Sequence, residues 1–134
     1  MRLSAQLLRI DGPLLLFGGP YSNLEATQAL LAEAARLRIP AERIICTGDV
    51  VAYGADPAAT VGLLRASGCH VVMGNCEESL AARATDCGCG FPAGSACERL
   101  SAAWFAYAAN RLDGDALTWM TGLPRQVSAS PSRR

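Results

Sequence analysis

The sequence predicts an α/β protein with a parallel β-sheet and flanking helices. Three short strand-like segments rich in apolar residues occur at residues 14–17, 43–47 and 69–73, and segments with helical periodicity separate them. Each run stops close to a glycine, as a strand buried on both faces does. Because strands that alternate with helices pair in parallel through right-handed crossovers, we expect a sheet of at least three parallel strands.

The first predicted strand, Leu14 to Phe17, leads into a predicted helix. Ser22 and Glu25 have the spacing of a capping box, which predicts Ser22 as the N-cap residue. Leucines and alanines then recur at helical spacing. Pro40 should end this helix because a proline nitrogen cannot donate the next helical hydrogen bond.

The second predicted strand, residues 43–47, is followed by a helix with clear signals at both ends. Asp56 is the predicted N-cap, Pro57 occupies the first helical position, and Gly68 suits the left-handed residue after the last turn. The third predicted strand, residues 69–73, follows at once.

The last third of the chain changes in character. Residues 83–97 are rich in cysteine and glycine and predict an irregular loop. Ser95 to Leu112 predicts a helix, and a shorter helix should run from Asp113 or Asp115 to near Gly122. Residues 126–134 are rich in Ser, Pro and Arg and predict a disordered tail. We expect residues 1–134 to form a single, partial domain.

The amino-acid composition indicates which classes of protein the sequence fits. Of the 134 residues, 51% are hydrophobic and 18% charged, which is typical of a soluble globular protein. The formal net charge is zero, so nothing indicates binding to nucleic acid or to acidic lipid. The apolar run at 14–17 is too short to span a membrane. We therefore expect a cytoplasmic protein. In that compartment cysteines are interpreted first as thiols or metal ligands and only second as disulfides.

Three loop sequences follow the three predicted strands. They are Gly19-Pro20-Tyr21-Ser22-Asn23-Leu24, Gly48-Asp49-Val50-Val51-Ala52-Tyr53-Gly54 and Gly74-Asn75-Cys76-Glu77. In order, spacing and position, the set resembles the motifs of calcineurin-like metallophosphoesterases, especially the small bacterial phosphodiesterases. The resemblance implies the first half of the family's αββα sandwich. It also implies a site at which two divalent metal ions activate a water for attack on a phosphate ester.

The resemblance assigns roles to individual positions. Asp49 and Asn75 match two metal ligands of the family. Gly19 and Tyr21 stand where the family has an aspartate and a histidine ligand, and Cys76 stands where it has a histidine near the leaving group. The only histidine of the chain, His70, lies inside the third predicted strand, so the family's later histidine motifs are missing.

Further residues are expected at the same edge. Glu77, next to Cys76, is a second catalytic candidate. Gly19, Tyr21, Asn23 and Tyr53 are expected to face the ligand. Any cofactor implied by the resemblance is a divalent metal, namely Mn, Fe, Mg or Zn, although too few ligands remain here for a standard pair of ions.

Three functions stay open. The chain is a metal-dependent phosphohydrolase with compromised activity, an inactive module that binds a phosphate-containing small molecule, or a protein with a cysteine-based metal or thiol site. The cysteines considered for that last site are Cys76, Cys87, Cys89 and Cys97, with a disulfide of the Cys87–Cys97 type and free thiols as alternatives. If the C-terminal half of the fold is absent, an exposed apolar sheet face predicts self-association or a partner chain.

Overall fold

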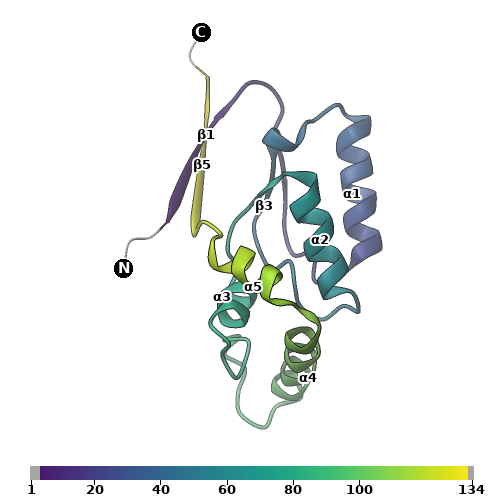
Figure 1. Cartoon of the computed structure of the whole chain (residues 1–134), viewed down its shortest axis with the longest axis vertical. Coiled ribbons are helices and arrows are strands. Elements are labelled where there is room, and N and C mark those ends of the chain that lie inside the picture. Colours follow the sequence, from purple (N-terminus) through teal and green to yellow (C-terminus); the bar gives the residue numbers. More distant parts are fainter. Residues whose placement is uncertain (1–3, 133–134) are drawn as a thin grey trace.

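The computed structural model describes residues 4–132 (Figure 1). The elements follow in the order β1 (Ala5–Ile10), β2 (Leu15–Phe17), α1 (Leu24–Arg36), the 3-10 turn η1 (Ala41–Arg43), β3 (Ile44–Cys46), α2 (Pro57–Ser67), β4 (His70–Val71), α3 (Asn75–Ala81), α4 (Ala96–Arg111), α5 (Gly114–Thr121) and β5 (Gln126–Pro131). None of these helices is long and apolar enough to cross a membrane.

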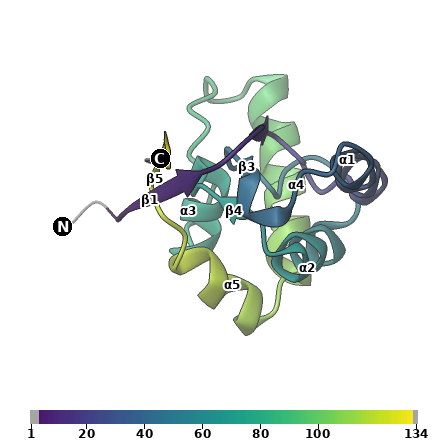
Figure 2. The same ribbon diagram turned by 90° about the horizontal axis from the view of Figure 1, so that it is seen from above.

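The predicted three-stranded parallel sheet is confirmed. Its order is β2-β3-β4, and the register pairs Leu16 with Ile45 and Cys46 with Val71. All three residues of the central strand β3 are buried. Seen from above, α1 and α2 lie on one side of β3, and β1 and β5 lie on the other (Figure 2). The fold class is therefore α/β with flanking helices, as the sequence predicts.

The α2 boundaries agree with the sequence signals, whereas the α1 boundaries do not. Asp56 is the N-cap of α2, and Gly68 ends the helix with a φ of 76°. Ser22 was expected to cap α1, but Asn23 does so by accepting a hydrogen bond from the N–H of Ala26 (3.0 Å). The Ser22 hydroxyl instead accepts from the N–H of Ala52, which ties it to the neighbouring loop.

The end of α1 also differs from the expectation. The helix stops at Arg36, before the predicted Pro40 boundary, and Arg38 then adopts a left-handed φ of 57°. The N–H groups of Leu37 and Arg38 still donate to carbonyl oxygens of the last turn. The chain therefore leaves the helix through a left-handed turn, and proline is not its first interruption.

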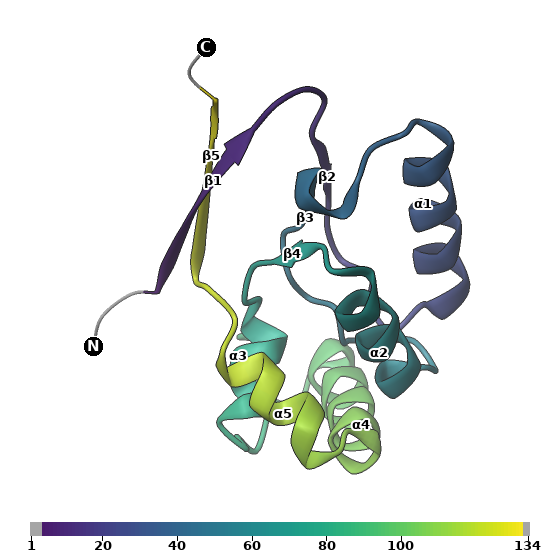
Figure 3. The ribbon, with the colours of Figure 1, turned by 45° about the horizontal axis from the view of Figure 1, so that its top comes forward.

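A second sheet, β1–β5, is absent from the sequence-based expectations. Its two strands pair in parallel, with Leu8 opposite Ala129. Residues 126–131, expected in a disordered tail, form β5, while residues 133–134 lie outside the described part. In Figures 1 and 3 this ribbon stands apart from the helices. Leu8 and Ile10 pack with Ile45, which connects the ribbon to the main sheet.

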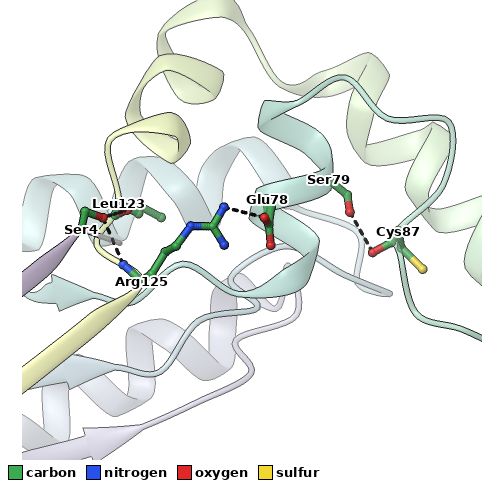
Figure 4. Close-up of polar contacts among 6 residues, drawn as sticks. All are labelled: Ser4, Glu78, Ser79, Cys87, Leu123 and Arg125. Carbon is green, nitrogen blue, oxygen red and sulfur yellow. Dashed lines mark hydrogen bonds and ion pairs between the residues drawn. The ribbon is translucent and has the colours of Figure 1, made fainter. Parts of the chain in front are cut away.

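Polar contacts hold the start of β5 in place (Figure 4). The N–H of Arg125 donates to the carbonyl oxygen of Ser4 (2.9 Å), and the Arg125 guanidinium forms an ion pair with Glu78 of α3. The ribbon is therefore tied to α3 at its lower end, beside α5, which packs against α3 (Figure 3).

The C-terminal helices agree with the sequence. Ser95 caps α4 and Asp113 caps α5 through side-chain hydrogen bonds. Residues 82–95 contain no helix or strand, so the predicted irregular loop is present, but Cys97 lies in the first turn of α4. Figure 1 shows α3, α4 and α5 gathered below the main sheet, at the carboxyl ends of its strands.

Candidate functional site

Three loops meet at the carboxyl ends of β2, β3 and β4. Backbone hydrogen bonds extend the β2–β3 pairing into the loops, since the N–H of Tyr21 donates to the Asp49 oxygen (3.1 Å) and that of Ser22 to the Val50 oxygen (2.8 Å). A small cavity of about 220 Å³ opens there. Its lining is Tyr21, Asp49, Ala52, Tyr53, Asn75, Cys76, Cys89 and Phe91.

The cavity brings together most of the residues singled out from the sequence. Asp49, Asn75, Cys76, Tyr21 and Tyr53 all line it. The other predicted residues lie elsewhere. Gly19 and Asn23 face a neighbouring cleft, and Glu77 lies beneath the loops with no exposed surface.

Glu77 holds the β3 and β4 loops together. One carboxylate oxygen accepts from the N–H groups of Asp49 (2.9 Å) and Gly74 (3.0 Å), and the other accepts from the N–H of Val51 (3.1 Å). Burial raises the pKa of Glu77, while these backbone donors oppose the shift. A carboxylate committed to three backbone donors has a structural task, and it presents no oxygen to the cavity.

Asp49 is the acidic residue of the cavity. It has a left-handed φ of 54°, and its Oδ1 accepts from the N–H of Cys76 (3.4 Å). Gly74 makes this approach possible, because a Cβ at that position would lie 2.3 Å from the same oxygen. Asp49 is half-buried, and its carboxylate is the only one among the residues that line the cavity.

Cys76, expected as a catalytic candidate, is poorly suited to act as a nucleophile. It is 4% exposed. Burial raises the pKa of its thiol well above the usual range, and the Asp49 and Glu77 carboxylates raise it further. Since the thiolate is the reactive form of cysteine, the neutral thiol at this position is inert at physiological pH.

Asn75, expected from the sequence as a metal ligand, lies at the first position of α3. Its amide nitrogen donates to the carbonyl oxygen of Cys87 (3.4 Å). Ser79 donates to the same oxygen (3.0 Å), as Figure 4 shows. Asn75 therefore helps to dock the irregular loop over the cavity and keeps its amide oxygen as a donor for a ligand.

The Tyr21 ring lies in the space that a side chain at Gly19 would enter. A Cβ added at Gly19 would lie 2.6 Å from two carbon atoms of the ring. Gly19 also has a φ of 62°, a conformation that side chains disfavour. The aromatic ring thus occupies the space in which a ligand side chain at position 19 would start. A side chain at position 19 would therefore require the Tyr21 ring to move.

The remaining predicted site residues have distinct surroundings. Asn23 uses its side chain as the α1 cap. Tyr53 is 59% exposed and contacts two other aromatic rings, those of Tyr21 and Trp104, with centroids 5.4 and 5.5 Å away. Phe91 and Trp104 were not expected near the site. Phe91 is the one aromatic residue of the glycine-rich loop, which is the signal that could have identified it.

The four cysteines considered for a metal site do not assemble. Cys87 and Cys89 form a disulfide, which differs from the Cys87–Cys97 pairing considered above. Cys97 is a free, exposed thiol on α4, and Cys76 is a free, buried one. The cysteine-based metal hypothesis therefore finds no support in the geometry.

The donor set does not fit a pair of metal ions. Within residues 4–132, no group of three or more His, Cys, Asp and Glu side chains is placed to hold an ion. Asp49 and the Asn75 amide oxygen are two possible donors, Glu77 is bound to the backbone, and Tyr21 covers Gly19. A dinuclear centre needs more ligands than these residues provide.

Comparisons with known proteins agree with the fold. A solved structure of a proposed diadenosine tetraphosphatase matches with a TM-score of 0.68 and 21% identity, over 96% of this chain and 50% of that one. A metallophosphoesterase from Sphaerobacter thermophilus matches with a TM-score of 0.59 and 22% identity, over 84% of this chain and 42% of that one.

A sequence relative covers a shorter stretch. The uncharacterized protein MJ0912 of Methanocaldococcus jannaschii is 44% identical over 55 residues, which are 41% of this chain and 22% of that protein. The chain thus spans at most half the length of these relatives. The family model described as calcineurin-like phosphoesterase matches residues 13–127. By this match the chain belongs to the calcineurin-like phosphoesterase family.

Proposed function

We propose that this chain is a phosphoesterase-family protein that keeps the ligand-binding edge of the fold but does not hydrolyse phosphate esters by itself. The observation that carries the proposal is the pair Gly19 and Tyr21. Glycine supplies no ligand, and the tyrosine ring fills the space that a longer side chain at position 19 would need.

The electrostatics of the cavity support the same conclusion. Asp49 is an acid, and none of the lining residues is Arg or Lys. Two like charges about 4 Å apart repel by about 1 to 4 kcal/mol near a protein surface. A phosphate ester alone would meet this repulsion without a cation to offset it. We therefore expect weak binding of phosphate esters to the isolated chain.

The test is turnover of bis(p-nitrophenyl) phosphate with added Mn²⁺, together with the metal content of the purified protein. We expect the wild-type chain to match Asp49→Ala in rate and to contain less than one transition-metal ion per chain. Asp115→Asn, a change in an exposed acid of α5 outside the small cavity, is the matched control. Turnover that is lost in Asp49→Ala and kept in Asp115→Asn would refute the proposal.

A second candidate is hydrolysis by a larger assembly. It is favoured by one observation, that the chain spans 50% and 42% of the two solved structures described above. In this case the missing ligands come from other residues, either in a longer protein or in a partner chain. The same assay on the protein isolated from its native source distinguishes the two, because only the second candidate gives Asp49-dependent turnover there.

A further inference from the structure

A larger cleft lies beside the small cavity, on the other side of Tyr21 and Tyr53. Its volume is about 590 Å³, and the β2 loop, the β3 loop and the first turn of α1 form its walls. Tyr21 and Tyr53 line both spaces. The cleft is therefore next to the family site, yet neither Asp49 nor Asn75 contributes to it.

The ionisable side chains that line the cleft are all acidic. Glu25 and Asp56 are the ionisable acids in its lining, and no lining residue is Arg or Lys. Neither carboxylate takes part in the ion pairs or side-chain hydrogen bonds found among residues 4–132. Each lies at a helix N-terminus, where an acid is favourable on its own. Their presence in one cleft adds two negative charges that no arginine of its lining balances.

The aromatic wall adds a second, independent feature. Tyr21 and Tyr53 are 43% and 59% exposed and meet edge to face with ring centroids 5.4 Å apart. Nearby, the Tyr107 ring is covered by the Arg111 guanidinium at 3.5 Å. No comparable cation covers Tyr21 or Tyr53 within the described part of the chain. Both rings therefore have exposed surface in the lining of the cleft and no cation of the described chain on them.

The backbone holds Tyr21 in this position against its own preference. Tyr21 has a left-handed φ of 52°, and Ser22 follows with 58°. Such conformations cost about 1 to 2 kcal/mol each in a non-glycine residue. The hydrogen bonds from both N–H groups to the β3 loop maintain them. Strain of this kind is concentrated at binding and catalytic sites.

We propose that this cleft binds an organic cation, a quaternary or alkylated ammonium group. Aromatic faces attract such cations through their quadrupole, and quaternary ammonium groups are the usual ligands of aromatic cages. The two carboxylates supply the opposite charge at longer range. A phosphate or carboxylate ligand would meet repulsion from the same two acids.

The test is a calorimetric or NMR titration with choline at low ionic strength. The comparison ligand is 3,3-dimethyl-1-butanol, which has the same shape as choline without the charge. We expect choline to bind at least 10-fold tighter. Tyr53→Leu should weaken choline binding about 2- to 30-fold. The double variant Glu25→Gln/Asp56→Asn should weaken choline binding about 2- to 10-fold.

The matched control is Asp115→Asn, because Asp115 is also an exposed acid in the first turn of a helix, α5, but lies outside the cleft. Circular dichroism confirms that each variant is folded, and the exposed Glu25→Gln keeps the test valid if Tyr53→Leu unfolds. Equal affinity for the neutral alcohol would overturn the proposal. The proposal would also be overturned if Asp115→Asn weakened choline binding as much as the cleft variants do, or if Ca²⁺ alone displaced choline.

The choline-binding test is independent of the proposed loss of phosphate-ester hydrolysis. Choline binding should persist in Asp49→Ala, because Asp49 does not line the cleft. Loss of choline binding in Asp49→Ala would place the cation in the small cavity and refute the assignment to the cleft. Turnover of a phosphate ester would refute the proposed function and leave the cleft assignment intact.

Discussion

The buried carboxylate of Glu77 should dominate the stability of the site loops. It accepts hydrogen bonds from the N–H groups of Asp49, Val51 and Gly74. Glu77→Ala removes all three acceptors. A buried donor without a partner costs about 1 to 3 kcal/mol, and water entering the vacated space recovers part of this. We expect a loss of about 3 kcal/mol or more, from a total that is typically about 5 to 15 kcal/mol.

The assay is equilibrium unfolding in urea, in which the midpoint should fall while the m-value stays constant. Glu77→Gln should lie between wild type and Glu77→Ala, since the amide keeps one acceptor oxygen. The neighbouring Glu78→Gln is the matched control. Glu78 is exposed and contacts Arg125 at the surface, and exposed pairs contribute little.

The same reasoning predicts a local signature. In hydrogen exchange, the amides of Asp49, Val51 and Gly74 should lose protection in Glu77→Ala to a greater degree than those of the central strand β3. If Glu77→Ala unfolds within about 0.5 kcal/mol of wild type, as an ordinary surface substitution does, the carboxylate does not hold the loops and the argument fails.

Four further predictions concern the same region. Burial raises the pKa of Glu77 above the usual 4.5, so above pH 4.5 the folded state keeps a proton that the unfolded state releases. The free energy of unfolding of wild type, relative to Glu77→Gln, should therefore fall as the pH rises above 4.5. Urea unfolding at several pH values measures this difference, and a rise would contradict the prediction. Gly19→Asp should cost about 1 to 2 kcal/mol because of its left-handed φ, and the contact of its Cβ with the Tyr21 ring should add to this. A double-mutant cycle should find a smaller cost in Tyr21→Ala, which removes the contact; additive effects would show that the two positions are uncoupled. Under native conditions iodoacetamide should modify Cys97 and spare Cys76, as peptide mass spectrometry would reveal; equal labelling would show that Cys76 is accessible. EDTA should leave the melting temperature unchanged by scanning calorimetry, since no metal is needed to hold the loops; a drop of several degrees would indicate a bound ion.

The main sheet could be predicted because its signals are local. Each of β2, β3 and β4 is an apolar run followed by a glycine turn, and α2 has Asp56, Pro57 and Gly68 at its ends. The β1–β5 pair could not, because β5 has the sequence Gln126 to Pro131 with almost no apolar residues. Its pairing depends on strands more than 110 residues apart in the chain, a contact that no local pattern encodes.

The site was predictable in its location but not in its geometry. Motif order placed Asp49 and Asn75 at one edge of the sheet, and both residues line one cavity. The direction of the Glu77 side chain was missed, although Gly74 and Glu77 have the same capping-box spacing that suggested a cap at Ser22. At the start of α3 the Glu77 side chain accepts from the N–H of Gly74, as in a capping box, whereas Asn23 is the cap of α1. The spacing alone does not distinguish these outcomes, which depend on tertiary packing.

The proposed loss of metal ligands and the proposed cation cleft both involve Tyr21. The resemblance implies a metal ligand at position 21, the Tyr21 ring lies over Gly19, and the same residue lines both the cavity and the cleft. A single reversion at position 19 would meet the ring, and a single reversion at 21 would leave a glycine without a donor. Because Glu77 accepts three backbone hydrogen bonds from the β3 and β4 loops, we expect the edge to keep its shape through such a change. On the two proposals made above, a phosphoesterase edge would give up its metal ions and take a ligand of opposite charge to phosphate.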